Sequence, residues 1–220
     1  DNRPCTTSIT GCTNEGKVES IAKGNHTYTA GICIIYNGSN GSTYADELII
    51  NNCVNNGEIE GDTVAGIIGN SSGNLKLSDC ENNGAINGRY SAGGIAQCIE
   101  NKNSNEAEVS NCINNGNVFG GAEAAGIIDY AEGITVTNCI NNGNISSNGY
   151  VGGIFSYTSS VKGTGLVNNG KISGLEDIGG ISAYDEGNSI FSKLYNTGVI
   201  DEENIGAQVS NLVKLGESST

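Results

Sequence analysis

The sequence predicts an all-β protein, a parallel β-solenoid (β-helix) of about seven coils, with roughly 27 residues and three short strands per coil. Three observations lead to this prediction. A phrase built around Asn-Asn-Gly recurs along the chain, and a second phrase of two small residues and Ile follows each copy. Glycine (34 residues) and Asn (32 residues) are abundant while Pro occurs once, and no long run has helical spacing.

The first phrase is clearest at 139–145, which reads CINNGNI. It recurs at 112–118, 80–86, 53–59 and more loosely at 12–18, and copies that begin with Leu lie at 166–172 and 194–200. Because the strands between the glycines are too short to stand alone, equivalent strands must pair from one coil to the next. We therefore expect one solenoid domain over 1–220, with a lead-in over 1–11, seven repeats over 12–206, a cap or tail over 207–220, and inserted loops near 17–28, 37–47 and 97–108.

One Asn is present in every copy of the phrase: Asn14, Asn55, Asn82, Asn114, Asn141, Asn168 and Asn196. Stacked coils would place these amides ~4.8 Å apart, so that they can form a hydrogen-bonded ladder along the rod. The Gly two positions later is expected to supply either a positive φ or room for a close approach of the backbone. The aliphatic residue two positions after that Gly should face the interior.

The residue that opens each phrase defines a column predicted to be buried: Cys12, Cys53, Cys80, Cys112, Cys139, Leu166 and Leu194. Leu can replace a buried thiol, but it can replace neither half of a disulfide nor a metal ligand. The column therefore favours free thiols. A bridge between Cys5 and Cys12 is an alternative near the N-terminus, and the state of Cys33 and Cys98 stays open.

Three tyrosines, Tyr130, Tyr157 and Tyr184, lie four residues after a repeat Gly in successive coils. Such a row is typical either of an aromatic ladder that stabilises a corner or of an exposed surface that stacks on sugar rings. Together with Tyr44 they are the speculative binding residues. The irregular inserts at 37–44 and 97–108 are further candidates for a partner surface.

The charge balance and the residue types exclude several functions. With 10 Lys+Arg against 24 Asp+Glu, a net charge of -14 argues against nucleic acid or an anionic membrane as partner. One His and no C-x-x-C pair lead us to expect no metal and no cofactor. Acidic groups such as Glu58, Glu60 and Asp62 fall on variable positions and are expected to be solvated rather than catalytic or calcium-binding.

Two features bear on location. No apolar run reaches the ~18 residues of a membrane helix, so we expect no membrane insertion. The chain begins at Asp1 and contains no Met, which leads us to expect a processed product or a fragment, and a removed signal peptide would fit.

The order of residues in the clearest repeat resembles the GLUG-type repeat, over about 10–206. The matching positions are Ala125, Gly126, Ile127, Ile128, Tyr130, Gly133, Asn138, Gly143 and Ile145. Such repeats occur in secreted and surface-anchored bacterial proteins, including the non-catalytic regions of IgA-cleaving metallopeptidases. This chain differs by using Ile for the usual Leu-Val and Cys for a Ser position. It also lacks H-E-x-x-H, so protease activity does not carry over.

We therefore expect no enzyme activity. The expected function is that of a secreted or cell-surface repeat module acting as adhesin, stalk or scaffold, with a carbohydrate or a host surface protein as partner. One alternative is a self-assembling extracellular filament subunit, because the end coils of a solenoid expose unpaired strand edges that favour end-to-end stacking. Another is a polysaccharide lyase or hydrolase built on a β-helix.

Overall fold

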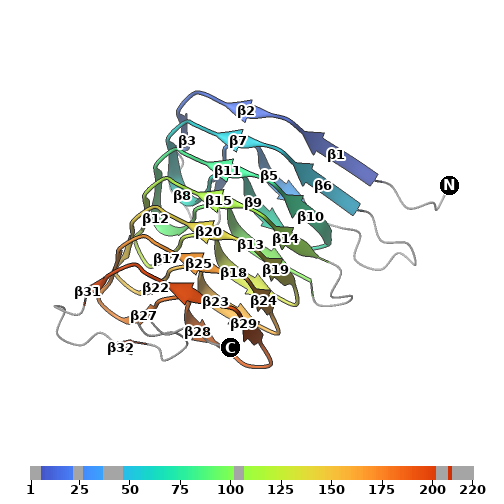
Figure 1. Ribbon diagram of the computed structural model, residues 1–220. Helices are drawn as coiled ribbons and strands as arrows, with labels where there is room; N and C mark the ends of the chain where they lie inside the picture. The colour runs from blue at the N-terminus through green and yellow to red at the C-terminus, as the bar shows by residue number, and fades with distance from the viewer. Residues whose placement is uncertain (1–5, 22–26, 37–46, 102–106, 202–207, 210–220) are drawn as a thin grey trace.

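The computed structural model describes residues 6–21, 27–36, 47–101, 107–201 and 208–209, and these residues form a parallel β-solenoid without helices (Figure 1). The coils stack with a spacing of about 28 residues, and the strand pairs between them are parallel. Because many strands contain only two or three residues, each is stable only as a member of a stack. The predicted fold class is confirmed.

Two stacks run the length of the rod. The first consists of β1 (Thr6–Thr10), β6 (Glu47–Asn51), β10 (Asn74–Ser78), β14 (Glu108–Ser110), β19 (Thr135–Thr137), β24 (Lys162–Thr164) and β29 (Ile190–Ser192). The second consists of β2 (Thr13–Asn14), β7 (Val54–Asn55), β11 (Glu81–Asn82), β15 (Ile113–Asn114), β20 (Ile140–Asn141), β25 (Val167–Asn168) and β30 (Tyr195–Asn196).

A third sheet has two limbs that meet in the long strands β8 (Ile59–Ala65) and β12 (Ile86–Gly93). Its first limb also contains β3 (Val18–Glu19), β16 (Val118–Gly120), β21 (Ile145–Ser147), β26 (Ile172–Ser173) and β31 (Ile200–Asp201). Its second limb also contains β4 (Tyr28–Ala30), β17 (Glu123–Ala125), β22 (Tyr150–Gly152), β27 (Asp177–Gly179) and β32 (Gln208–Val209). The fourth stack is β5 (Cys33–Tyr36), β9 (Ile68–Ser71), β13 (Ala96–Glu100), β18 (Ile128–Glu132), β23 (Phe155–Ser159) and β28 (Ser182–Asp185).

Two details of the prediction need correction. The first two stacks hold seven strands but the fourth holds six among the described residues, so the coil number differs slightly from seven. A coil also contains four or five strands rather than three, because it crosses both limbs of the third sheet. In β12 the two limbs are joined at an irregularity between Gly88 and Ser91, where the pairing register shifts.

Parts of the expected inserts are strands. Residues 22–26, 37–46 and 102–106 lie outside the described part of the chain. Within the expected insert 97–108, however, β13 includes all residues up to Glu100, and β14 begins at Glu108.

The corner between the first and second stacks has a left-handed backbone in every coil. Its residue has a φ between 53° and 67° at Gly11, Asn52, Asp79, Asn111, Asn138, Gly165 and Lys193. Gly, Asn and Asp adopt this conformation at low cost, which explains why they dominate the column.

The Asn ladder is confirmed. Each Nδ2 donates to Oδ1 of the ladder Asn in the next coil at 2.7 Å, in all six steps from Asn14 to Asn196. The same Nδ2 donates to the carbonyl oxygen two residues later in its own coil, at 2.8 to 3.3 Å. Both N–H groups of each inner ladder amide are therefore used, apart from the second N–H of Asn196.

A second, exposed ladder runs beside the first. It consists of Asn56, Asn83, Asn115, Asn142 and Asn169, with Thr197 at its end. Here each Asn donates to the preceding coil at 2.8 to 2.9 Å, opposite to the direction of the inner ladder.

The glycines of the repeats allow close approach. A Cβ on Gly116 would lie 1.9 Å from the carbonyl oxygen of Gly84 in the preceding coil, so tight passage and not a positive φ explains this column. A Cβ on Gly126 would lie 2.4 Å from Cγ of Asn141. The second phrase and the ladder therefore touch across the coil.

This contact lies between two hydrophobic clusters. One contains the Ile that follows each small pair, including Ile95, Ile127 and Ile154. The other contains the aliphatic residues that follow each ladder Gly: Ile59, Ile86, Val118, Ile145, Ile172 and Ile200, with Val18 at its edge. Both predicted interior walls are confirmed.

The column of Cys and Leu is buried in the first cluster at six positions: Cys53, Cys80, Cys112, Cys139, Leu166 and Leu194. The prediction is wrong for Cys12, which is exposed: the thiols of the column contact carbonyl oxygens of the preceding coil, and no described coil precedes Cys12. Cys12 and the four buried cysteines of the column are thiols, as is the buried Cys98. Cys5 lies outside the described residues.

Candidate functional site

The tyrosine row forms a stack of rings on β18, β23 and β28. The ring centroids of Tyr130 and Tyr157 are 4.7 Å apart with an interplanar angle of 7°, and those of Tyr157 and Tyr184 are 5.3 Å apart at 28°. Cys98, in the coil before Tyr130, is the register partner of Tyr130, so the column of the tyrosines continues into that coil without an aromatic ring. Tyr44 lies outside the described residues.

The stacking leaves little ring surface for a sugar. The facing sides of the three rings are covered by one another, and Tyr184, which is 43% exposed, also contacts the ring of Tyr150 at 6.0 Å. Tyr130 donates a hydrogen bond from its hydroxyl to Glu132 at 3.1 Å, and a hydrogen bond with Glu186 raises the pKa of Tyr157 to about 12. This geometry favours the aromatic-ladder interpretation of the row.

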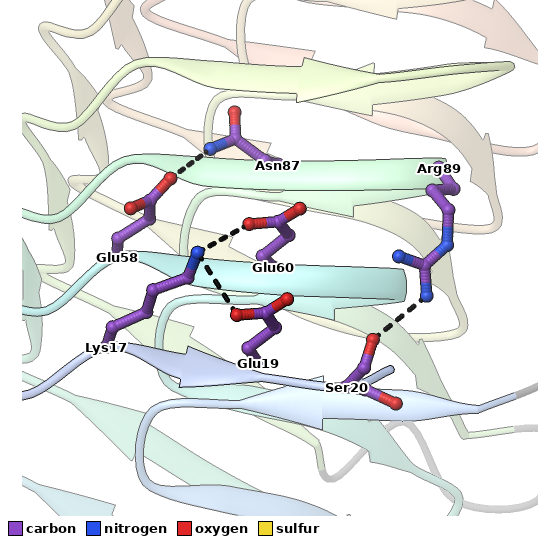
Figure 2. Close-up of polar contacts among 7 residues, drawn as sticks. All are labelled: Lys17, Glu19, Ser20, Glu58, Glu60, Asn87 and Arg89. Carbon is purple, nitrogen blue, oxygen red and sulfur yellow. Dashed lines mark hydrogen bonds and ion pairs between the residues drawn. The ribbon is translucent and has the colours of Figure 1, made fainter. Parts of the chain in front are cut away.

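The acidic residues near the N-terminus form a surface network (Figure 2). Lys17 Nζ lies 2.7 Å from Glu60 and 3.3 Å from Glu19, and Asn87 donates to Glu58 at 2.8 Å. The hydrogen bond from Lys17 lowers the pKa of Glu60. These exposed contacts join the first three coils across the first limb, and each contributes little to stability.

Asp62 is the exception to the prediction of solvated acids. Its side chain is 2% exposed, and it forms an ion pair with Arg89 Nε and accepts a hydrogen bond from Thr27 at 3.0 Å. Arg89 also donates from Nη2 to the backbone carbonyl of Ser20 at 3.0 Å (Figure 2). Asp62 is buried because the guanidinium covers it, which is the arrangement that a buried carboxylate requires.

A different set of residues meets at the corner between the second limb and the fourth stack. At this corner lies the Gly of the second phrase, which is Gly31, Gly66, Gly94, Gly126 or Gly153 depending on the coil. The residue three positions before this Gly and the residue three positions after it lie on the two sides of the corner. One column contains Tyr28, Thr63, Ser91, Glu123 and Tyr150, which are register partners. The other contains Gly69, Gln97, Asp129 and Ser156, which lie between the paired positions of the fourth stack.

Several residues of these two columns line a hollow of about 360 Å³. Its lining residues are Tyr28, Thr63, Tyr90, Ser91, Gln97, Ala122 and Glu123. The side chains of Thr63 and Ser91 in the first column are small, and they lie between the larger Tyr28 and Glu123 along the hollow. Tyr90 is 50% exposed at its rim.

Asp129 is a fully buried carboxyl group next to the hollow. It accepts hydrogen bonds from Ser156 Oγ and from Gln97 Nε2, the latter at 3.2 Å. Burial, together with the charge of Glu123, raises its pKa to about 7, although hydrogen bonds from Ser156, Gln97 and Ser91 act in the opposite direction.

The hollow contains more acceptors than donors. Burial also raises the pKa of Glu123. In the described part of the chain, neither Glu123 nor Asp129 forms an ion pair with a basic side chain. The Oε1 atom of Gln97 is buried and receives no hydrogen bond. This is the chemical character of a binding site for a group rich in donors.

The sequence analysis missed Glu123 and Asp129. Both belong to repeat positions that hold neutral residues in neighbouring coils, Ser91 and Tyr150 on one side, Gln97 and Ser156 on the other. Aligning the repeats on the corner Gly126 would have shown two acids at symmetrical positions in one coil. Their proximity, however, depends on how sharply the corner turns.

Comparisons of the chain with protein-family models, with curated proteins and with solved structures find no match. The GLUG resemblance therefore stays a prediction. Within the described ranges, no helix is long and apolar enough to cross a membrane, and no group of three or more His, Cys, Asp or Glu side chains is placed to hold a metal ion.

Proposed function

We propose that the chain is a non-catalytic repeat module of a secreted or cell-surface protein, serving as adhesin, stalk or scaffold. The observation that supports this role is the inner ladder, which continues from Asn14 to Asn196 through every coil. A buried polar network with its hydrogen bonds satisfied rigidifies a structure. A rigid rod holds the groups at its two ends, or along its side, at fixed distances.

Two measurements test this proposal, one on the producing cells and one on the purified chain. Antibodies to the chain should label intact cells or detect the chain in the medium, and recovery only after lysis would contradict the proposed location. Beads coated with the purified chain should adhere to a carbohydrate or protein surface, and beads coated with the chain unfolded in urea and washed serve as the control.

The ends of the ladder favour a second candidate, the self-assembling filament. Within the described residues, the Oδ1 of Asn14 receives only the Gly16 N–H, at 3.3 Å, and Asn196 donates only to the Gly198 carbonyl, at 3.3 Å. One end thus offers an acceptor and the other a donor, which suits head-to-tail stacking.

Sedimentation velocity at increasing concentration tests this filament proposal. Rods that lengthen with concentration would establish the filament, provided that Thr7→Lys, which places a charge on the exposed edge strand β1, abolishes them. One small species at all concentrations would remove it.

The carboxyl groups of Glu123 and Asp129 keep the polysaccharide enzyme as a third candidate, since paired carboxyls hydrolyse glycosidic bonds. The complete burial of Asp129 weighs against it, because this group cannot touch a glycosidic oxygen. Release of new reducing ends from a polysaccharide by the wild-type chain, and its loss in Glu123→Gln, would overturn the non-catalytic proposal.

A further inference from the structure

We propose that the hollow at the corner between β12, β13 and β17 binds a primary alkylammonium group, of the kind carried by an amino sugar or by a lysine side chain. This site is separate from the scaffold role and does not depend on where the protein is located. The inference rests on three properties of the hollow: its unpaired acceptors, its uncompensated charge and its aromatic walls.

The first property is the orientation of Gln97. Its side chain is 8% exposed, and its Nε2 donates to Ser91 Oγ and to Asp129 Oδ2, both at 3.2 Å. In this arrangement Oε1 is the end of the amide without a partner. A buried acceptor without a donor is unfavourable, so an N–H donor is the ligand group that suits this position.

The second property is the charge. Glu123 lines the hollow and Asp129 lies beside it, and the two carboxyl groups raise the free energy of each other's ionised form. An ammonium ion offers three donors and no acceptor. It therefore complements Glu123 and Gln97 at once, whereas a neutral hydroxyl would leave the carboxylate charge uncompensated.

The third property is the pair of tyrosine rings. Tyr28 and Tyr90 both line the hollow, and Tyr90 stands half-exposed at its rim. A cation within about 6 Å of an aromatic face is attracted to the electron-rich face of the ring. A volume of about 360 Å³ is large enough for a pyranose ring or for the end of a lysine side chain.

The test is a titration of the intact chain with three probes at neutral pH, followed by NMR or calorimetry. Glucosamine presents the ammonium on a sugar, Nα-acetyl-lysine amide presents it on an amino-acid side chain, and N-acetylglucosamine has the same ring without the charge. We expect binding of at least one of the two amines and at least about tenfold weaker binding of the acetylated sugar, the equivalent of one ion pair. Binding of glucosamine alone assigns the site to amino sugars, and binding of the lysine probe alone assigns it to a protein partner.

Three variants make the test specific. Glu123→Gln keeps the shape of the side chain and should weaken amine binding at least about tenfold. Tyr90→Ala should weaken it several-fold. Glu108→Gln, on the exposed face of β14 in the first stack, should change nothing. Circular dichroism confirms that each variant keeps its fold.

The proposal is overturned by any of three results: no binding of either amine, equal binding of N-acetylglucosamine, or undiminished amine binding by Glu123→Gln. None of these results bears on the scaffold proposal, which is tested by location and adhesion.

Discussion

The inner ladder links six buried amides, each costly to bury alone, and the half-buried Asn14 into one hydrogen-bonded chain. Between the two ends, each Asn accepts a hydrogen bond from the preceding coil and donates one to the next, so a missing side chain leaves a partner unsatisfied on both sides. The outer ladder has the same chemistry but is open to water, which can replace any missing bond.

The two ladders offer a matched pair of substitutions. Asn114→Ala removes the acceptor of Asn82 and the donors to Asn141 and Gly116. We expect a loss of about 3 kcal/mol or more in the free energy of unfolding, because buried groups lose their partners. Asn115→Ala, one residue away in the exposed ladder, should cost about 1 kcal/mol or less. Urea unfolding measures both, and equal losses would show that burial of the ladder is not what makes it matter.

The Gly that follows each ladder Asn offers a second pair. In Gly116→Ala the new Cβ would meet the carbonyl oxygen of Gly84 at 1.9 Å, so the two coils must separate. We expect a fall in the melting temperature of more than about 10 °C, or insoluble expression. Gly16→Ala occupies the same column in the first coil, where no atom lies within 4 Å of the new Cβ, and should melt close to the wild type.

At the scale of elements, the corner between the second limb and the fourth stack joins side chains from β12, β13, β17, β18 and β23 around Asp129. The groups that face it are Ser91, Gln97, Glu123 and Ser156, and among them Glu123 is the only one that carries charge. The carboxyl group therefore has no cation to favour its ionised form, and burial decides its protonation.

The raised pKa of Asp129 makes the folded state less stable as the pH rises. In the unfolded chain an Asp releases its proton near pH ~3.9, whereas folded Asp129 holds it up to about pH 7. Between these values the folded state binds more protons, so the contribution of Asp129 to stability falls as pH rises through this window. Asp129→Asn lacks this titration. We expect the stability of the variant relative to the wild type to increase by a few kcal/mol between about pH 4 and pH 8.

Chemical denaturation of both chains across that range measures the difference. A parallel pH dependence of the two chains would show that Asp129 is ionised throughout. Glu132→Gln, on the same strand β18 but outside this corner, provides the control and should follow the wild type.

At the scale of the whole molecule, the alkylation rates of the thiols measure how often the folded rod exposes its interior to solvent. The pKa of Cys112 is raised by its hydrogen bond with Cys139 and by burial, and that of Cys80 by its hydrogen bond with Cys112 and by burial. Reaction with iodoacetamide requires the thiolate and access to solvent. We expect Cys12 to be modified in the folded protein and Cys80 and Cys112 to react at least about 100-fold more slowly.

Mass spectrometry of the modified peptides gives the rate at each position. In concentrated urea the three rates should converge, because the chain is then unfolded. Labelling of Cys112 as fast as that of Cys12 in native buffer would contradict the buried column.

The parts of this protein that repeat were predictable from sequence, since a solenoid is nearly one-dimensional. Asn141, Cys112 and Ile145 keep their environment from coil to coil, so their column alone shows that they are buried, paired or packed. Cys12 is an exception because the side chains of this column pack toward the preceding coil, and no described coil precedes the first. Asp62 is a second exception, because it is buried by an ion pair with Arg89 of the next coil, which its own column does not show.

The sequence by itself determined the coil: its period, its ladder, its hydrophobic walls and its close-packed glycines. All of these follow from contacts between equivalent residues of adjacent coils, which a repeat pattern records directly. Only the tertiary structure decided that the tyrosine rings cover one another and that Glu123 and Gln97 line a hollow beside the buried Asp129. Those contacts join residues at different positions of the repeat, and they depend on the angle of a corner, which leaves no period in the sequence.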